Sequence, residues 1–310
     1  METTFVSTKQ FSREKILLTG GTGLLGHGLA ASCHSDSRVY SLSVRRHSND
    51  SPWKNQQHLD ITSKSCVEKI FSRVSFDAVV HAAGIASVDH VRENYAESLE
   101  SNIVGTLNIS SACRKRSIPL IYISSNAVFD GSKPPYCETD RPNPVNEYGE
   151  LKLECERLIQ KTINNYLIVR PILMYGWNGR WGRLNPITWL LQKLENNETV
   201  NLVDDVKENP LYNVEAGRCI WKALEMNMQG ILHLAGATEV SRYELAVKAA
   251  EVFGKNPGLI RPVPSSHFSN LAVRPPNTTF ETSRMRKELG IPPLSLPEGL
   301  RAMKHAKPNL

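Results

Sequence analysis

Short apolar runs recur along the chain. They are separated by longer segments in which apolar residues recur with the spacing of a helix. Several runs are apolar at consecutive positions, as in Lys15-Ile-Leu-Leu-Thr19. Strands that are apolar on both faces are typical of parallel sheets, which are buried between layers of helices. The pattern predicts strands at residues 15–19, 38–43, 57–60, 77–81, 119–124, 166–170 and 231–234.

This alternation of strands and helices predicts an α/β fold. Parallel neighbours need crossover connections, which are right-handed and usually contain a helix. We therefore expect a doubly wound parallel sheet with helices on both faces. After Pro171 the pattern loosens into a loop at 177–182, a helix at about 185–194 and Pro-rich turns at 261–264 and 274–276.

Composition excludes several classes of protein. The chain has 310 residues, 40% apolar and 22% charged, which is ordinary for a globular protein. No stretch approaches the roughly 20 apolar residues of a membrane span, and residues 1–12 lack the apolar segment of a signal peptide, so we expect a cytoplasmic protein. The net charge is +6, but the basic residues are dispersed, which argues against nucleic acid. The cysteines and histidines lack metal-ligand spacing, so we expect no bound metal.

A glycine-rich turn follows the first predicted strand. It reads Gly20-Gly-Thr-Gly23-Leu-Leu-Gly26, one residue longer between its first two glycines than the common dinucleotide-binding pattern. Gly20 would permit the tight turn, Gly23 would let the backbone approach a pyrophosphate, and Gly26 would let the next helix pack closely. A helix starting near Gly23 would point its positive N-terminus at the phosphates. A turn without a ligand is the alternative, but the strand before it and the apolar helix face after it favour dinucleotide binding.

Ser125, Tyr148 and Lys152 form a second candidate site. A tyrosine and a lysine four positions apart share one face of a helix, so the ammonium group of Lys152 can favour the ionised phenol of Tyr148. A phenol activated in this way can give a proton to a carbonyl oxygen as hydride reaches the carbonyl carbon. Ser125 follows the apolar run 119–123, at the strand end where ligands bind in such sheets, and its hydroxyl could hold the same carbonyl. Alone, the Tyr-x-x-x-Lys pattern is more often a surface tyrosine beside a solvated lysine, and only the glycine turn upstream favours catalysis.

Together these motifs resemble the extended short-chain dehydrogenase/reductases, and within them the dTDP-4-dehydrorhamnose reductase group. The similarity runs from about Lys15 to about Leu300. It includes the segments Leu59-Asp60-Ile61-Thr62, His81-Ala-Ala-Gly84, Asn102-Ile-Val-Gly-Thr-Leu-Asn108, Ser124-Ser-Asn-Ala-Val-Phe-Asp-Gly131, Arg170-Pro171 and Arg274-Pro275-Pro-Asn277. The resemblance implies a Rossmann domain at 13–174 with a return segment at about 209–237, and a smaller C-terminal substrate-binding lobe at 175–208 and 238–310.

The resemblance also implies roles for single residues. Asp60 would hydrogen-bond the adenine, residues 81–84 would line the nicotinamide ribose, and Asn102 would brace the sheet beneath the catalytic site. Asp60 could instead cap a helix beginning at Thr62, and Asn102 could also satisfy backbone groups in a helix kink. The expected cofactor site contains Gly20, Thr22, Gly23, Leu24, Leu25, Gly26, Arg45, Arg46, Asp60, Ile61, His81, Ala82, Ala83, Gly84, Asn102, Tyr148, Lys152 and Pro171.

The end of the second predicted strand bears on the choice between NAD and NADP. Sites specific for NAD usually place an acid there to bind the ribose 2'-hydroxyl, whereas arginine suits a 2'-phosphate. The strand ends at Ser43 without an acid, and Arg45 and Arg46 follow closely. We therefore expect NADP(H) to be preferred over NAD(H), against an alternative in which both arginines only decorate an exposed loop.

The residues after Ser125 narrow the reaction. Sugar-nucleotide dehydratases of this superfamily have an acid pair at this point, and bifunctional epimerase-reductases have a cysteine near the position of Ala127. This chain has Asn126 and Ala127 instead, which leaves simple carbonyl reduction. The expected substrate-binding residues are Ser125, Asn126, Val128, Trp177 and Arg274. Arg274 would either pair with the diphosphate or order the loop over it, and the alternative is a surface arginine that only precedes two prolines.

Three functions stay open. The first is an NADPH-dependent reductase of a nucleotide-activated 4-keto-6-deoxy sugar with Tyr148 as the proton donor. The second is a regulatory binding subunit, because the β subunit of methionine adenosyltransferase has this fold and a similar Ser-Ser-Asn-x-Val-Phe-Asp-Gly segment. The third is an epimerase that retains NAD. Dimers are common in the family, so a homodimer is a further expectation, although no apolar helix face in the sequence argues for one.

Overall fold

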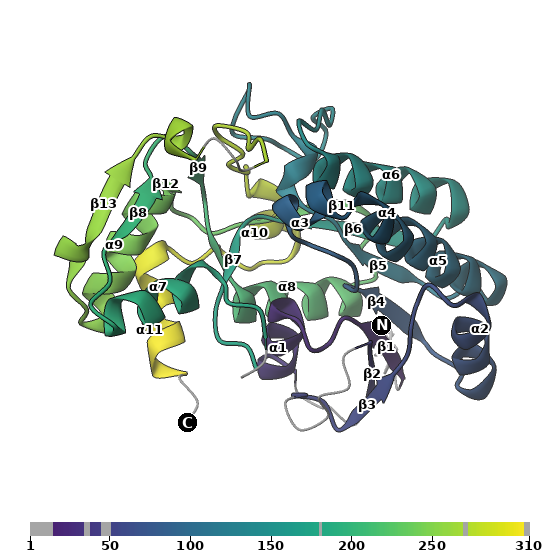
Figure 1. Ribbon diagram of the computed structural model, residues 1–310. Coiled ribbons are helices and arrows are strands. Elements are labelled where there is room, and N and C mark those ends of the chain that lie inside the picture. Colours follow the sequence, from purple (N-terminus) through teal and green to yellow (C-terminus); the bar gives the residue numbers. More distant parts are fainter. Residues whose placement is uncertain (1–14, 34–37, 45–50, 180–181, 269–271, 307–310) are drawn as a thin grey trace, which may run out of the picture.

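The computed structural model describes residues 15–33, 38–44, 51–179, 182–268 and 272–306. Its centre is a seven-stranded sheet in the order β3-β2-β1-β4-β5-β6-β11, in which every neighbouring pair is parallel (Figure 1). The strands are β1 (Ile16–Thr19), β2 (Val39–Ser43), β3 (Asn55–His58), β4 (Ala78–His81), β5 (Leu120–Ile123), β6 (Tyr166–Pro171) and β11 (Gly230–Leu234).

Helices cover both faces of this sheet, as the alternation of elements predicted. They are α1 (Leu24–Ala31), α2 (Lys64–Arg73), α5 (Gly105–Arg116), α6 (Glu147–Thr162) and α8 (Asn213–Glu225). Alternate strand residues point to opposite faces, so Ile16 and Leu18 of β1 lie in one core cluster and Leu17 in the other. Helices α1 and α8 contribute to the first cluster, and α2, α5 and α6 to the second. The doubly wound arrangement is therefore confirmed.

The predicted strands agree with the structure except at one edge. The third strand was expected at 57–60 and is found at Asn55–His58. Its residues are polar, and half of them are exposed, because an edge strand packs little apolar surface. The apolar Leu59 lies just beyond the strand, and Ile61 lies in the turn that follows.

A third core cluster lies outside the sheet. It is built from α7 (Pro186–Glu195), α9 (Arg242–Phe253) and α11 (Leu296–His305) with the strand pair β8 (Val200–Val203) and β13 (Ile260–Val263). Figure 1 shows these elements together on the left of the sheet and its helices. Residues 280–291 return to the sheet, where Met285 of α10 (Ser283–Glu288) packs in the first cluster. We propose that the chain has the two expected lobes and that residues 280–291 of the smaller lobe form part of its contact with the sheet.

Short elements complete the described chain. They are α3 (Val88–Glu93), α4 (Tyr95–Leu99), the π-helix η3 (Glu100–Val104), the 3-10 helices η4 (Asn126–Val128), η5 (Pro257–Leu259) and η6 (Ser265–His267), and the strands β7 (Met174–Tyr175), β9 (Lys207–Glu208), β10 (Leu211–Tyr212) and β12 (Val240–Ser241). Within the described ranges, no helix is both long and apolar enough to cross a membrane.

Candidate active site

The glycine turn after β1 allows two close approaches of backbone. Gly20 has a φ of +75°, and a Cβ atom there would lie 2.7 Å from the backbone of Ala82. A Cβ atom on Gly26 would lie 2.1 Å from the carbonyl oxygen of Gly21, so a larger residue would force α1 away from the turn. Gly23 is exposed and precedes the first residue of α1. The turn therefore presents the N-terminus of α1 to solvent, as a phosphate-binding site requires.

Trp53 supports this turn, although the sequence analysis did not single it out. Its side chain is buried, and its indole N–H donates to the carbonyl oxygen of Gly21 at 3.0 Å. On the other side of the turn, the hydroxyl oxygens of Thr22 and Ser43 lie 3.0 Å apart. A lone tryptophan in a polar stretch before β3 was the available signal for this contact.

The residues expected near the adenosine half have mixed positions. Arg45 and Arg46 lie outside the described residues. The carboxylate of Asp60 accepts hydrogen bonds from the backbone N–H and the hydroxyl of Thr62, at 2.9 and 2.8 Å. Helix α2 is capped by Ser63 and not by Asp60, so the alternative role as a helix cap was wrong in that detail. Asp60 instead fixes the turn that leads into the helix.

Several expected cofactor residues can contribute only backbone atoms. Leu25 and Ile61 are buried in the two core clusters, and Pro171 is buried at the end of β6. Leu24 is half-buried at the first position of α1. Their apolar side chains are consistent with a role in packing. A family motif contains such packing residues as well as residues that contact the cofactor.

His81 is fully buried beneath the site. Its Nδ1 lies 2.6 Å from the hydroxyl of Thr19, and its Nε2 lies 3.1 Å from the hydroxyl of Thr106. Burial, together with the nearby charge of Lys152, lowers the pKa of His81 from 6.5 to about 3, so the ring is neutral. The imidazole therefore braces the sheet, and only the partly accessible residues 82–84 are left to face a ribose.

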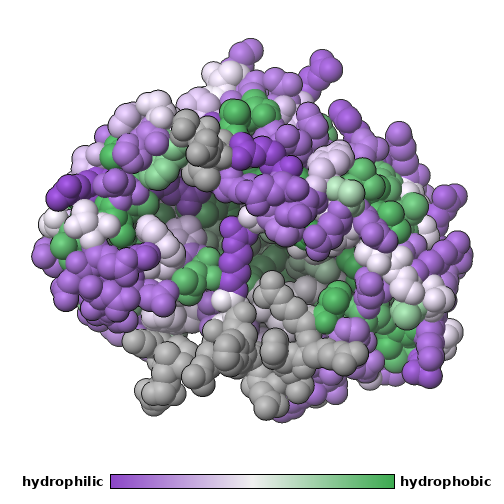
Figure 2. Space-filling view, viewed as in Figure 1, coloured by the Kyte–Doolittle hydropathy of each residue, from purple (hydrophilic) through white to green (hydrophobic). Residues whose placement is uncertain are grey.

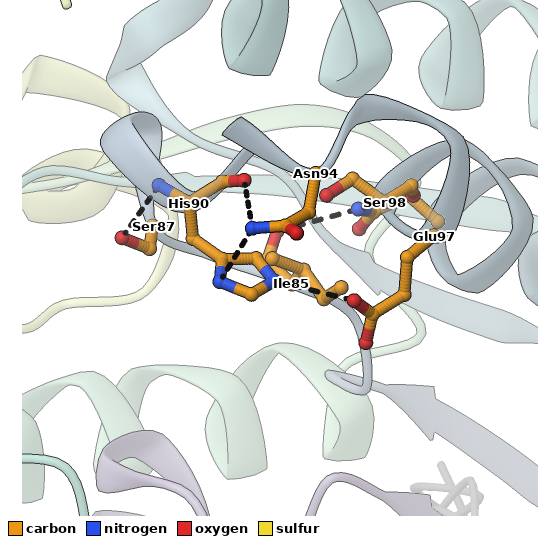
Figure 3. Close-up of polar contacts among 7 residues, drawn as sticks. Ile85, Ser87, His90, Asn94, Glu97 and Ser98 are labelled. Carbon is orange, nitrogen blue, oxygen red and sulfur yellow. Dashed lines mark hydrogen bonds and ion pairs between the residues drawn. The ribbon is translucent and has the colours of Figure 1, made fainter. Parts of the chain in front are cut away.

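Asn102 lies in the π-helix η3 and holds two segments together. Its side-chain N–H groups donate to the carbonyl oxygens of Ser98, at 2.9 Å, and Ile85, at 3.3 Å. Figure 3 shows Ser98 on the helix and Ile85 on the loop after β4, with His90 and Glu97 forming a looser contact of 3.6 Å nearby. The side chain thus serves backbone groups where the helix is irregular, which is compatible with the bracing role expected for it.

Tyr148 and Lys152 lie one turn apart on α6 and are both buried. The ammonium group of Lys152 donates to the carbonyl oxygen of Ile123 at 2.9 Å and to the hydroxyl of Tyr122 at 3.3 Å. It lies 6.0 Å from the centroid of the Tyr148 ring. The lysine is therefore anchored at the carboxyl end of β5 while its charge remains close to the phenol.

Ser125 is brought to the same place by the turn after β5. It caps η4, and its hydroxyl oxygen accepts from the backbone N–H of Ala127 at 3.1 Å. The first turn of α6 packs on η4 so closely that a Cβ atom on Gly149 would lie 2.1 Å from the carbonyl oxygen of Ala127. The structure thus brings Ser125 to the N-terminal end of the helix that carries Tyr148.

A buried ion pair lies behind these residues and was not predicted. Glu156, one turn after Lys152, pairs with Arg170 of β6 at 2.7 Å, and both side chains are only 2% exposed. The same carboxylate accepts from the hydroxyl of Ser124 at 2.5 Å. This contact fixes the residue before Ser125 to α6 and β6. Removing either charge would leave the other buried and unpaired, which is costly.

Two expected substrate residues have their side chains engaged elsewhere. Val128 is fully buried in the first core cluster, because η4 turns it inward, so its assignment to the substrate is a correction. The Trp177 indole N–H donates to the carbonyl oxygen of Met303 in α11 at 2.6 Å, and its ring packs against Phe253. Trp177 therefore helps to hold the smaller lobe together.

Arg274 forms an ion pair with Asp89 of α3 at 2.7 Å. Its guanidinium also donates to the carbonyl oxygen of Ala272, whose backbone N–H donates to the same aspartate. These bonds favour the second of the two expected roles, in which Arg274 orders the segment near the site.

Figure 2 shows the molecule hollowed between the smaller lobe and the sheet domain, with apolar surface in the depth and polar residues at the rim. A separate surface groove of about 890 Å³ lies between α4, η3 and α6 and includes none of the predicted site residues. In the described part of the chain, no cluster of His, Cys, Asp or Glu side chains could hold a metal ion.

Comparison with known proteins identifies the family. A model of the RmlD substrate binding domain matches residues 14–307. The chain belongs to this family. It is similar to a dTDP-4-keto-6-deoxy-D-glucose reductase of Streptomyces niveus, with 29% identity over 283 residues that cover 91% of this chain and 93% of the relative. It is also similar to methionine adenosyltransferase 2 subunit beta of Bos taurus, with 26% identity over 284 residues, 89% of this chain and 83% of that protein.

A solved structure has the same fold. The dTDP-4-dehydrorhamnose reductase of Bacillus anthracis, in complex with NADP, superposes with a TM-score of 0.85 at 24% identity, over 94% of this chain and 99% of that one. The family model and the curated relatives confirm the expected class, an extended short-chain dehydrogenase/reductase of the dTDP-4-dehydrorhamnose reductase type.

Proposed function

We propose that this chain is an NADPH-dependent reductase of a nucleotide-activated 4-keto-6-deoxy sugar. The observation that carries the proposal is the anchoring of Lys152 to the end of β5 at 2.9 Å, one helical turn from Tyr148 and beside the turn that holds Ser125. The relative from Streptomyces niveus, by its name a reductase of a dTDP-4-keto-6-deoxy sugar, supports the substrate class.

The glycine turn and the exposed N-terminus of α1 would hold the pyrophosphate of the cofactor, because a side chain at Gly20 or Gly26 would collide with backbone there. When bound, NADPH supplies a hydride to the keto carbon. Ser125 would donate a hydrogen bond to the keto oxygen, and Tyr148 would give it the phenolic proton, so that the product is an alcohol. Lys152 would stabilise the phenolate that remains.

The preference for NADP is also part of the proposal. Strand β2 ends at Ser43 without an acidic residue, and Arg45 and Arg46 follow it in the sequence. The reductase of Bacillus anthracis was solved with NADP, which supports the same choice. Guanidinium groups match the geometry of a 2'-phosphate.

The deciding experiment is turnover of NADPH with a panel of 4-keto-6-deoxy sugar nucleotides, followed at the absorbance of the reduced nicotinamide. Tyr148→Phe should lower kcat at least ~10²-fold with NADPH affinity nearly unchanged, since ring packing is kept and only the proton donor is lost. Turnover by the wild type that survives in this variant would refute the assignment of Tyr148. No turnover with any sugar nucleotide would refute the reaction.

A binding subunit is the second candidate function, supported by the similarity to methionine adenosyltransferase 2 subunit beta of Bos taurus. It predicts co-purification with a catalytic partner and no turnover of NADPH. An epimerase would instead carry bound NAD through purification, which extraction of the nucleotide would reveal. The homodimer and the cytoplasmic location stay predictions, to be measured by light scattering against the chain mass of 34.7 kDa and by cell fractionation.

A further inference from the structure

The side chain of Asn126, next to Ser125, is held by two residues from distant parts of the chain. One of its amide N–H groups donates to a carboxylate oxygen of Glu208 at 3.0 Å, and the other to the hydroxyl of Thr278 at 2.7 Å. Its carbonyl oxygen is the acceptor for the hydroxyl of Ser125 at 3.3 Å. Both N–H groups of this amide and one lone pair of its carbonyl oxygen are therefore engaged.

Glu208 determines which way the amide faces. If the amide turned over, its carbonyl oxygen would lie against a carboxylate oxygen. Both atoms are acceptors, and neither carries a hydrogen to donate. The second carboxylate oxygen of Glu208 lies 2.8 Å from a guanidinium nitrogen of Arg242, and the positive charge compensates the buried carboxylate although, among the described residues, no N–H points at this oxygen. Glu208 is 9% exposed and Thr278 is 2% exposed, so water competes little for these bonds.

We propose that Glu208 is a positioning residue for the reaction, and that it acts on Ser125 through Asn126. Glu208 belongs to β9 and Arg242 begins α9, whereas Ser125 follows β5 of the sheet. The carboxylate thus joins the smaller lobe to the catalytic turn. It keeps the Asn126 carbonyl, and not its N–H groups, turned toward Ser125, so that the single hydroxyl hydrogen of Ser125 is held at this point until the keto oxygen of the substrate accepts it.

This proposal rests on the proposed reductase function, and an experiment that exchanges the amide and the carboxylate separates the two. In Glu208→Gln, the single carbonyl oxygen of the introduced glutamine can face either Arg242 or Asn126. Its N–H groups then face the donor groups of the other residue. In Asn126→Asp, two carboxylates face each other. In the double variant, the introduced amide can accept from Arg242 through its carbonyl oxygen while its N–H donates to the introduced carboxylate, so every partner is again satisfied.

We expect each single variant to lower kcat/KM about tenfold, and the double variant to regain most of that loss, as coupled neighbours do. NADPH affinity should stay unchanged in all of them, because the contacts of Asn126 and Glu208 described above do not include the glycine turn. The Tm should show the same pattern, with the double variant above both singles. Glu239→Gln is the matched control, since Glu239 is an exposed acid of the same lobe whose contacts with Lys207 and Asn277 are both long, at 3.5 Å.

A double variant no better than the weaker single in kcat/KM would overturn the proposal, and so would single variants with wild-type kcat/KM. If the Tm alone followed the pattern, the pair would be structural and not positioning. A wild type without turnover would refute the proposed function, and the positioning role of Glu208 would be refuted with it. Should Asn126→Asp fail to fold, Arg242→Met in the Glu208→Gln background must restore kcat/KM, because it frees the carbonyl oxygen of the introduced amide for Asn126.

Discussion

Glu215 in α8 should make the protein less stable at alkaline pH than at mildly acidic pH. Its carboxyl group is 3% exposed, and one oxygen accepts from the backbone N–H of Leu294 at 2.7 Å. The other oxygen has no hydrogen-bond partner among the residues that the structure describes. Burial raises the pKa of Glu215 from 4.5 to about 7, against the opposing effects of the Leu294 N–H and Arg218, while Glu298 adds to the rise.

The sign of the effect follows from this direction. A carboxyl group whose pKa is raised by folding binds its proton more tightly in the folded state. Its contribution is fully present below pH 4.5 and is lost as the pH rises toward about 7. The rise in the pKa of Glu215 corresponds to about 3 kcal/mol of unfolding free energy, because each tenfold change in proton affinity corresponds to roughly 1.4 kcal/mol. Between pH 5 and pH 8.5 about 2.5 kcal/mol of this would be seen.

Glu215→Gln removes the ionisation and therefore this dependence. With an unfolding entropy of roughly 2 cal/mol/K per residue, the Tm difference between variant and wild type should be about 4 °C more favourable to the variant at pH 8.5 than at pH 5. The measurement is differential scanning calorimetry of both proteins at both pH values. Comparing differences removes any constant cost of the new amide, whose N–H groups would also be buried.

Glu225→Gln is the control, because Glu225 is exposed at the end of the same helix. It should change the Tm by the same small amount at both pH values. If Glu215→Gln behaved in the same way, the carboxyl group would not be buried in an unfavourable setting, and the reasoning from its unpartnered oxygen would be refuted.

Three further predictions concern ligands. Arg45→Ala with Arg46→Ala should weaken NADPH and hardly affect NADH, since charge-assisted bonds contribute roughly 1.5 to 3 kcal/mol each; equal losses in titrations of both cofactors would exclude a role at the 2'-phosphate. Arg274→Ala should raise KM for the sugar nucleotide severalfold, and Asp89→Ala should do the same if their 2.7 Å ion pair orders the segment; an unchanged KM in Asp89→Ala would point to direct binding by Arg274. Trp53→Phe should weaken NADPH about five- to tenfold with kcat unchanged, because only the 3.0 Å bond to the glycine turn is lost; unchanged affinity by fluorescence titration would show that the turn holds itself.

The sheet was predictable because its strands are short apolar runs with local punctuation. The glycine turn and the helix that carries Tyr148 and Lys152 were predictable for the same reason, since their spacing is local. The polar edge strand β3 was shifted by two residues because it has no apolar run of its own.

Contacts between residues far apart in the sequence could not be predicted. Asn126 and Glu208 are separated by 82 positions, and Asn126 and Thr278 by 152, so no periodicity relates them. Val128 shows the opposite failure, since Ser125 and Asn126 just before it lie at the site while η4 turns the Val128 side chain into the core. Pattern alone gives the order of residues along a turn, and not the direction in which each side chain leaves it.

The wide helical turn at η3 determines the direction in which each side chain of α5 leaves the helix axis. Thr106 reaches the imidazole of His81 at 3.1 Å, and Asn108 donates to the carbonyl oxygens of Ile61 and Thr62 at 3.0 and 2.9 Å. Deleting one residue from η3 would turn these side chains by about 100° around the helix axis, away from the sheet. The wide turn therefore determines which face of α5 packs against the sheet beneath the catalytic residues. A helix of the same composition without it would present other side chains to the sheet.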